Sequence, residues 1–292
     1  MRLVHFWREG QVRLGVKTDR GVLDVAAARA ALGIPGPETL AEVMAGGTGS
    51  LAALAEAAAA RPELGPGIFL DEADLRFAPC VPAPGKILCI GLNYRQHAAE
   101  AAMEVPEHPV IFGKYPNALA GHGEPIPVPP GVTQMDYEGE LTLVIGRRAR
   151  QVSREEALGY VFGYCIGNDI SARDLQFRTS QWLLGKSCDG FAPIGPYLVT
   201  ADEVPDPQNL QLRTYVNGEL RQEAWTGAMI FDCAYLVHYL SQYMTLEPGD
   251  LIMTGTPAGV ALGRPDRPWL RPGDEVAVEI TGLGRLCNRI VG

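Results

Sequence analysis

Two acidic residues alternate along a segment that has the pattern of a β-strand. Glu138 and Glu140 are two positions apart, so their side chains point to one face of the strand, while the apolar residues at 141, 143 and 145 point to the other. Side chains at this spacing lie about 7 Å apart, where two ionised carboxylates repel each other unless they share a cation. The alternative is a pair of ordinary surface charges, which this spacing taken alone favours.

Asp169 supplies a third carboxylate at the end of a second strand. It follows the apolar run 161–166, and polar residues placed at the ends of strands often form sites. Three oxygen ligands with no nearby Cys or His pair suit Mg²⁺ or Mn²⁺ with open water positions, and they do not suit a closed zinc site. The sequence therefore predicts a metal site at Glu138, Glu140 and Asp169 that can accept a chelating substrate.

His97 and Glu100 form a candidate acid-base pair. They are three residues apart, and on a helical turn their side chains share a face, so Glu100 can orient the imidazole and raise its basicity. The alternative is a solvent-exposed pair on a short helix. The spacing is typical of both a catalytic pair and a surface pair. Only the other motifs of the chain favour the catalytic interpretation.

Lys186 does not belong to a phosphate-binding loop, because the position that requires glycine is Ser180. It is instead a candidate for holding a substrate carboxylate or enolate, with a surface lysine as the equal alternative. The small loop 254–259, which follows a strand, can bring backbone amides and a hydroxyl group close to an anion, or it can be a simple tight turn.

Composition excludes several classes of protein. The chain has 292 residues, of which 47% are hydrophobic and 20% charged, so it is globular and long enough for one large or two modest domains. Its net charge of −9 would repel nucleic acid and anionic membranes. The six cysteines form no C-x-x-C pair, the first residues lack a signal-peptide pattern, and no long apolar run is present. We expect a soluble, cytoplasmic protein.

The first part of the chain predicts a small domain. Two apolar runs between residues 3 and 25 indicate a β-hairpin or meander. Within the alanine-rich stretch 26–60, Ser50 is placed as an N-cap before a short helical segment over 51–60. Five prolines between residues 61 and 84 are typical of a linker. We therefore predict a small N-terminal domain over 1–82, with β-strands and short helices, and a second domain over 83–292.

The second part is rich in predicted strands. They cover residues 86–91, 109–112, 141–145, 159–166, 210–216, 251–254 and 276–280. Asn217-Gly218 is the preferred pair for a type I′ hairpin turn. Helical patterning is limited to 153–158 and 230–244. The pattern favours an α+β, β-rich fold.

Several of these motifs together resemble the fumarylacetoacetate hydrolase family. Their order and spacing match over residues 85–290, which is about two-thirds of the chain, and the matching segments are Gly91-Leu92-Asn93-Tyr94 with His97 and Glu100, Asp136-Tyr137-Glu138-Gly139-Glu140, Gly167-Asn168-Asp169, Gly185-Lys186-Ser187 and Thr254-Gly255-Thr256-Pro257. The resemblance implies a mixed β-roll of the family's C-terminal type, usually dimeric, with an added small β-rich N-terminal domain. Phe112-Gly113-Lys114 and Asp189-Gly190-Phe191 depart from many relatives, which puts substrate specificity in doubt.

The resemblance also assigns residues to roles. It implies that Glu138, Glu140 and Asp169 bind one Mg²⁺ or Mn²⁺ ion per subunit. It implies that His97 and Glu100 form a catalytic dyad on a lid that orders over the substrate. Lys186 would be a catalytic residue that also binds substrate, and Gln176 and Thr256 match further substrate-contacting positions.

The function implied is cleavage of a carbon-carbon bond in a small 2-oxo acid, an acylpyruvate or a β-diketo acid. The metal would stabilise an enolate, and the dyad would activate water. The same site would serve an oxaloacetate-type decarboxylase, or an isomerase acting on a keto-enol pair or on the double bond of a 2-hydroxydienedioate. An alternative of another class is a dimer that binds a metal and a dicarboxylate without catalysis, against which the retention of His97, Glu100 and Lys186 argues.

Overall fold

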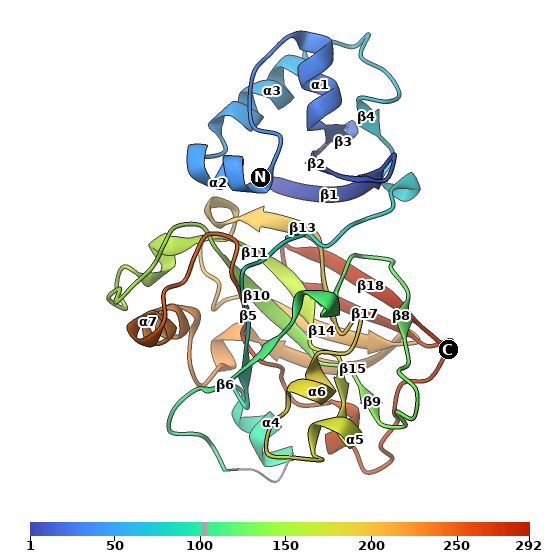
Figure 1. The fold of residues 1–292 in the computed structure, drawn as a ribbon, viewed down its shortest axis with the longest axis vertical. Coiled ribbons are helices and arrows are strands. Elements are labelled where there is room, and N and C mark those ends of the chain that lie inside the picture. Colours follow the sequence, from blue (N-terminus) through green and yellow to red (C-terminus); the bar gives the residue numbers. More distant parts are fainter. Residues whose placement is uncertain (101–103) are drawn as a thin grey trace.

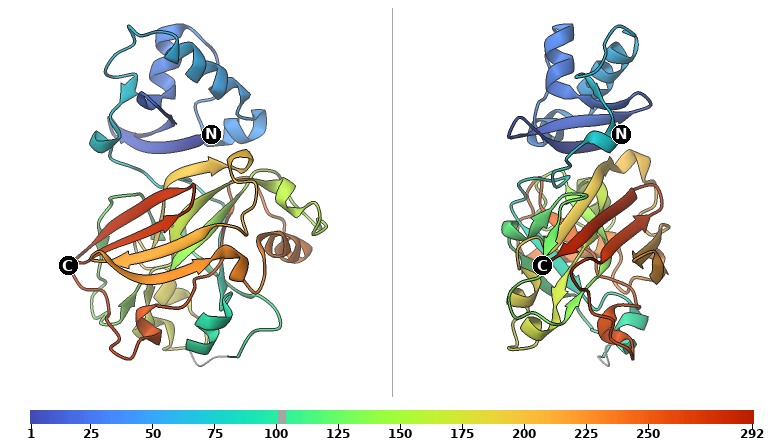
Figure 2. Two further views of the ribbon diagram at one scale, coloured as in Figure 1. Left: turned by 180° about the vertical axis from the view of Figure 1, so that it is seen from behind. Right: turned by 90° about the vertical axis from the view of Figure 1, so that its right-hand side faces the viewer.

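The computed structural model describes residues 1–100 and 104–292, and within this range the chain forms two lobes (Figure 1). A smaller N-terminal lobe of strands and helices lies above a larger lobe built mainly of strands, and Figure 2 shows the same division from behind and from the side. The sheets contain antiparallel neighbours and a smaller number of parallel ones. The predicted α+β, β-rich fold with mixed sheets is confirmed.

The bounds of the elements are as follows. The strands are β1 (Arg2–Arg8), β2 (Gln11–Thr18), β3 (Gly21–Asp24), β4 (Phe69–Leu70), β5 (Ile87–Gly91), β6 (Val110–Lys114), β7 (Leu119–Ala120), β8 (Ile126–Pro127), β9 (Met135–Asp136), β10 (Gly139–Ile145), β11 (Val161–Asn168), β12 (Ser171–Ala172), β13 (Ala192–Thr200), β14 (Gln211–Val216), β15 (Glu219–Trp225), β16 (Leu251–Met253), β17 (Glu275–Ile280) and β18 (Gly284–Val291). The α-helices are α1 (Val25–Leu32), α2 (Leu40–Gly46), α3 (Gly49–Ala59), α4 (Arg95–Glu100), α5 (Arg173–Gln176), α6 (Leu183–Lys186) and α7 (Cys233–Tyr243).

The N-terminal lobe opens with the predicted hairpin, which β1 and β2 form. The alanine-rich stretch folds into α1, α2 and α3, and the side chains of Asp24 and Thr39 cap the first two of these helices. The prediction that Ser50 caps a helix is wrong, because α3 begins at Gly49 and Ser50 lies inside its first turn. The N-cap residue is Thr48, two positions before Ser50, and its side chain makes no capping hydrogen bond.

One strand joins the two lobes. β1 pairs antiparallel with β13, with Leu3 opposite Leu198, so the largest sheet runs from the N-terminal lobe into the larger lobe. The order along this sheet is β4-β3-β2-β1-β13-β11-β10-β16-β5-β6. A second sheet has the order β15-β14-β17-β18-β8, and β9 pairs with β12. The boundary between 1–82 and 83–292 stays a prediction, since the sheet crosses it.

β10 lies in the interior of the largest sheet, and both of its faces are covered. Leu141 and Leu143 belong to one apolar cluster, whereas Val144 belongs to another on the opposite face. Alternation places Glu140 on the same face as Val144. Every residue of this strand is buried, so the carboxylate of Glu140 cannot be an ordinary surface charge.

Three local predictions in the larger lobe can be compared with the structure. Asn217 and Gly218 both have positive φ, 52° and 80°, as a type I′ turn requires, and they join β14 to β15. The helix predicted over 230–244 is α7, which Asp232 caps. The helical patterning over 153–158, a polar-rich turn, corresponds to turn residues followed by a 3₁₀ helix at Ala157–Tyr160 and not to an α-helix. None of the helices in the described part of the chain combines the length and apolar character needed to cross a bilayer.

His5 in β1 should make stability depend on pH. Burial lowers the pKa of this imidazole to about 4, while Nδ1 donates a hydrogen bond to the Cys80 carbonyl at 2.9 Å. The unfolded chain therefore binds a proton at a higher pH than the folded chain, and stability falls as pH drops below about 6.5. Between pH 7 and pH 5 we expect this residue to account for about 2 kcal/mol of lost unfolding free energy.

Urea unfolding at the two pH values tests this. The His5→Gln variant should lose about 2 kcal/mol less than the wild type between pH 7 and pH 5. The exposed His108 offers a matched control. The unfolding free energy of His108→Gln should decrease between pH 7 and pH 5 as much as that of the wild type. Equal slopes for all three proteins would show that His5 does not set the pH dependence.

Candidate active site

The strands that carry the acidic residues are neighbours, and this brings the three carboxylates together. β10 pairs antiparallel with β11, with Glu140 opposite Gly167. Glu138 precedes β10 and Asp169 follows β11, so both residues leave the sheet at the same edge. One ligand atom from each of Glu138, Glu140 and Asp169 can be chosen such that all lie within 4.8 Å of one another, and all three residues are buried. The structure thus assembles the predicted set, although its role stays a prediction.

Two of the three carboxylates have cationic partners. Lys186 Nζ lies 2.7 Å from Glu138 Oε2 and 2.8 Å from Asp169 Oδ2. Lys114 Nζ lies 2.6 Å from Asp169 Oδ1, and Arg173 Nη2 lies 2.5 Å from Glu138 Oε1. Burial alone would raise the pKa of Glu138, but the charges of Arg173 and Lys186 outweigh it and hold this pKa well below its usual range.

Glu140 is the exception. It is 1% exposed, and within the described residues no lysine or arginine forms an ion pair with it. Its Oε2 accepts a hydrogen bond from the backbone amide of Gly255 at 2.8 Å. Burial, with the negative charges of Asp169 and Glu138, raises the pKa of Glu140 well above its usual range. A hard divalent cation fits this set of oxygen donors, because it would compensate the charge that the protein leaves unpaired.

The predicted dyad is close to this set but is not hydrogen-bonded. His97 is buried on α4, and its Nδ1 lies 3.7 Å from Glu100 Oε2, beyond hydrogen-bond distance. The carboxylate of Glu100 instead accepts from the backbone amide of Gly259, at 3.1 Å and 3.0 Å. In this conformation Glu100 therefore holds α4 against the loop that follows β16, and it does not orient the imidazole.

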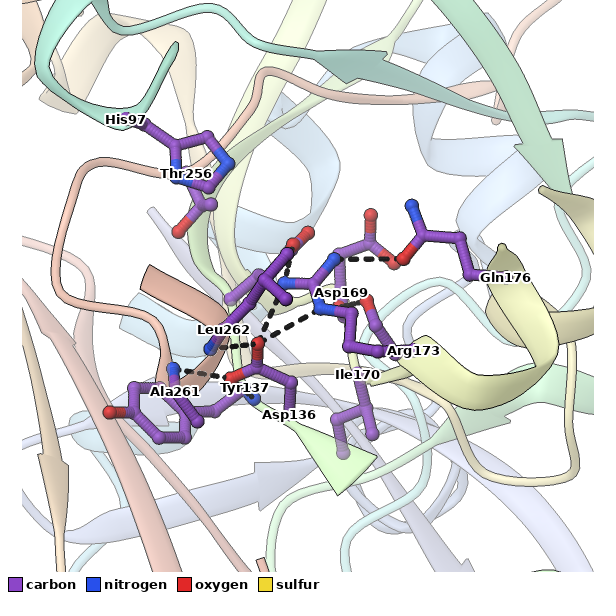
Figure 3. A network of polar contacts seen from close by, with 12 residues as sticks. His97, Asp136, Tyr137, Asp169, Ile170, Arg173, Gln176, Thr256, Ala261 and Leu262 are labelled. Atoms are coloured by element: carbon purple, nitrogen blue, oxygen red, sulfur yellow. Dashed lines mark hydrogen bonds and ion pairs between the residues drawn. The ribbon is translucent and has the colours of Figure 1, made fainter. Parts of the chain in front are cut away.

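The two further predicted residues also line the cavity. Gln176 lies on α5, and its Oε1 accepts from Arg173 Nη1 at 2.9 Å, as Figure 3 shows. Thr256 Oγ1 accepts from Gln222 Nε2 at 2.7 Å and donates to the Gly139 carbonyl at 2.9 Å. The Thr256 hydroxyl is thus already bonded in both directions. A substrate oxygen would have to displace one of these bonds to use it.

The cavity itself is small and has two kinds of wall. Its volume is about 60 Å³. The predicted residues His97, Glu138, Glu140, Gln176, Lys186 and Thr256 all line it. The remaining wall is mainly apolar and comes from Ile90, Leu92, Phe112, Phe177, Trp182 and Leu262. This space suits a small substrate with a charged end and a short remainder.

Sequence reasoning missed two buried cations of the site. Arg173 is 3% exposed and Lys114 is 4% exposed, and each bonds to a predicted metal ligand. Lys114 also donates to the carbonyls of Ile170, Phe191 and Lys186. A signal existed for Arg173, since it is three residues before Gln176 and shares a helical face with it. Lys114 lies in the segment Phe112-Gly113-Lys114 that was compared with the family, but no local spacing tied it to the carboxylates.

Comparison with known proteins identifies the chain's relatives. Residues 86–291 match the model of the fumarylacetoacetate (FAA) hydrolase C-terminal family. A bovine protein named oxaloacetate tautomerase FAHD2B, mitochondrial, is 38% identical over 297 residues, which covers 100% of this chain and 92% of that protein.

Two solved structures are similar over the whole chain. A fumarylacetoacetate hydrolase from psychrophilic Exiguobacterium antarcticum is 36% identical, with a TM-score of 0.81 and coverage of 100% of this chain and 99% of the other. A 2-hydroxyhepta-2,4-diene-1,7-dioate isomerase from Mycobacterium marinum is 34% identical, with a TM-score of 0.74 and coverage of 100% and 98%. The family match, the full-length relatives and the shared fold lead to one conclusion, that this chain is an enzyme of the fumarylacetoacetate hydrolase family.

Proposed function

We propose that the chain catalyses the keto-enol tautomerisation of a small 2-oxo acid of the oxaloacetate type. The observation that carries the proposal is that one imidazole, His97, and one ammonium group, Lys186, line the same small cavity as Glu138 and Glu140. Tautomerisation moves a proton between carbon and oxygen, so it needs a base and a group that stabilises the developing negative charge. Both are present in one place.

Glu138, Glu140 and Asp169 are the residues that would hold one Mg²⁺ or Mn²⁺ ion. Their oxygen donors suit a hard ion, and within the described residues no lysine or arginine forms an ion pair with Glu140, so a bound cation would hold its carboxylate ionised. When bound, such an ion acts as a Lewis acid on the 2-oxo group.

Lys186 supports the developing charge from the protein side. Burial acts to lower its pKa, but Asp169 and Glu138 outweigh burial and raise it, so the ammonium group remains charged at neutral pH. Negative charge that builds on the 2-oxo oxygen as the neighbouring carbon loses a proton is stabilised by such a fixed cation. Gln176 adds an amide whose oxygen is already held by Arg173, which leaves its N–H groups as the donors for a carboxylate.

His97 is the proposed base. It would take a proton from the carbon beside the 2-oxo group and deliver it to the oxygen of that group, or move it in the reverse direction. A single imidazole suffices for this exchange, which agrees with the 3.7 Å separation of His97 Nδ1 from Glu100 Oε2. The bovine relative, which is named an oxaloacetate tautomerase, supports oxaloacetate as the type of substrate.

Cleavage of an acylpyruvate, which the sequence favoured, is the second candidate. Glu100 is only slightly too far from His97 to bond, so a small rotation of the Glu100 side chain would complete a dyad able to activate water. The apolar wall at Phe112 and Trp182 would hold an acyl group. Decarboxylation of oxaloacetate and isomerisation of a 2-hydroxydienedioate would use the same residues. The homodimer and the cytoplasmic location expected from the sequence are likewise proposals.

Glu140→Gln should change stability in two opposite directions. Without metal, the variant should be more stable than the wild type by about 1 kcal/mol or more, because it removes a buried carboxylate that has no cationic partner. With Mn²⁺ at 100 times its dissociation constant, the wild type should gain about 3 kcal/mol and the variant almost nothing. Urea unfolding with EDTA or with Mn²⁺ measures both effects. The exposed Glu155→Gln is the control and should follow the wild type, and an equal gain in all three proteins would contradict the metal assignment.

His97→Ala should separate chemistry from metal binding. We expect kcat for the conversion of enol to keto oxaloacetate, followed by ultraviolet absorbance, to fall about 10²- to 10⁴-fold because the base is lost. Mn²⁺ affinity, measured by calorimetry, should be unchanged. Glu100→Gln should lower this kcat by less than about tenfold, since one imidazole can carry the exchange.

The rival reactions are followed in parallel. Release of pyruvate from acetylpyruvate or oxaloacetate reports hydrolysis or decarboxylation. The second candidate would replace the proposal if the wild type releases pyruvate faster than it tautomerises oxaloacetate and if Glu100→Gln loses most of this pyruvate release. The exposed His108→Ala serves as the matched control and should behave as the wild type in every assay.

A further inference from the structure

Asp136 is a buried carboxylate that the proposed chemistry does not use. It lies in β9, is 0% exposed, and accepts a hydrogen bond in each of four positions. Oδ1 accepts from the amides of Tyr137 at 2.9 Å and Ala261 at 2.7 Å. Oδ2 accepts from the amide of Leu262 at 3.0 Å and from Arg173 Nε at 2.9 Å. A carboxylate offers about four acceptor sites, so Asp136 has none left for a metal or a substrate.

On one side Asp136 fixes the guanidinium group of Arg173. The same guanidinium bonds Gln176 Oε1 at 2.9 Å, as Figure 3 shows. It also bonds Glu138 Oε1 at 2.5 Å, so it stands between a proposed metal ligand and a proposed substrate contact. The donors of arginine are arranged in a rigid plane. Without the bond from Asp136, the guanidinium group can rotate, and its bonds to Glu138 and Gln176 lose their fixed direction.

On the other side Asp136 fixes the loop that receives α4. The amides of Ala261 and Leu262 begin a 3₁₀ helix just after Gly259, whose own amide bonds the carboxylate of Glu100. Gly259 has φ of +106°, and a Cβ there would lie 2.0 Å from the Arg221 carbonyl oxygen, so the path of this loop allows no side chain. The position of α4, and with it His97, therefore depends on this loop.

We propose that Asp136 is a positioning residue that joins these two halves of the site. Through Arg173 it sets Glu138 and Gln176, and through the amides of residues 261 and 262 it sets the loop that holds Glu100. Metal affinity and the seating of α4 therefore depend on one carboxylate that touches neither metal nor substrate. The kinetic consequence rests on the proposed function, whereas the effects on metal affinity and on α4 do not.

Asp136→Asn is the sharpest variant because it keeps the shape and removes the charge. With its oxygen toward Tyr137 and Ala261, the asparagine would turn its NH₂ group toward Arg173 Nε and the amide of Leu262, so donors would face donors. A buried donor left without an acceptor is costly, and the guanidinium would move away. Asp174→Asn is the matched control, since Asp174 is the next residue to Arg173 and its carboxylate accepts only from the Thr133 amide and hydroxyl in the described structure.

Two measurements on the full chain test the proposal without relying on turnover. By calorimetry with Mn²⁺ alone, Asp136→Asn should raise the dissociation constant about 10- to 100-fold, as loss of a group that orients a metal ligand typically does. By amide hydrogen exchange on the metal-free protein, residues 94–100 and 255–263 should exchange faster while β11 is unchanged. Asp174→Asn should match the wild type in both. A loss of stability alone would accelerate exchange in β11 as well.

Coupling to Arg173 supplies a second test. In an Arg173→Lys background, Asp136→Asn should cause little further loss of Mn²⁺ affinity, because both changes interrupt the same path. In turnover of oxaloacetate, Asp136→Asn should raise KM, since Gln176 is displaced, and also lower kcat, since the loop that positions His97 is released. If Asp136→Asn does not fold, the Mn²⁺ affinity of the Arg173→Lys variant tests the proposal by itself. An Arg173→Lys protein that binds Mn²⁺ as tightly as the wild type would overturn the proposal.

A folded Asp136→Asn protein with wild-type affinity and wild-type exchange would equally overturn it. The proposed reaction can fail separately. A wild-type enzyme that binds Mn²⁺ but does not tautomerise oxaloacetate would contradict the proposed function, while the affinity and exchange measurements would still decide the role of Asp136.

Discussion

The site is organised around an excess of negative charge inside the protein. Glu138, Glu140 and Asp169 converge within 4.8 Å in a buried region, where carboxylates repel and cannot be solvated. Lys186 and Arg173 compensate part of this charge by direct ion pairs. Glu140 has no such partner among the described residues, and its raised pKa reflects that imbalance. The account of metal binding, and of the chemistry that follows from it, rests on this one carboxylate.

The fold supplies the geometry through a small number of connections. β10 and β11 are adjacent, so acids before one strand and after the other meet at one edge of the sheet. The short helices α5 and α6 follow β12 and return Arg173, Gln176 and Lys186 to the same edge. The loop after β16 supplies the amides that Glu140 and Glu100 accept from. Asp136 then ties the α5 side to the loop side.

The sequence predicted the parts of this site that follow a local rule. Strand alternation separated Glu140 from Leu141 and Leu143, and it did so because β10 is regular and buried. Positive φ at Asn217 and Gly218 agrees with the turn that this pair prefers. The remaining site residues were predicted from the order of several family motifs along the chain. No single spacing between two residues could have identified them.

What could not be predicted depends on contacts between distant parts of the chain. Arg173 and Asp136 are 37 positions apart, and Ala261 and Asp136 are 125 apart, so no periodic pattern connects them. The pairing of β1 with β13 is of the same kind, since each strand alone reads only as an apolar run. Helix ends were missed for a simpler reason, because several polar residues near 48–50 and 153–158 can begin a turn, and the tertiary structure selects among them.

The most direct test of the central claim is a crystal structure of the enzyme with Mn²⁺, with anomalous scattering recorded to locate the ion. The account predicts one anomalous peak per chain, bonded to an oxygen of each of Glu138, Glu140 and Asp169. A map with no peak there, or with a peak that leaves Glu140 unbonded, would contradict the claim that the unpaired carboxylate defines the metal site.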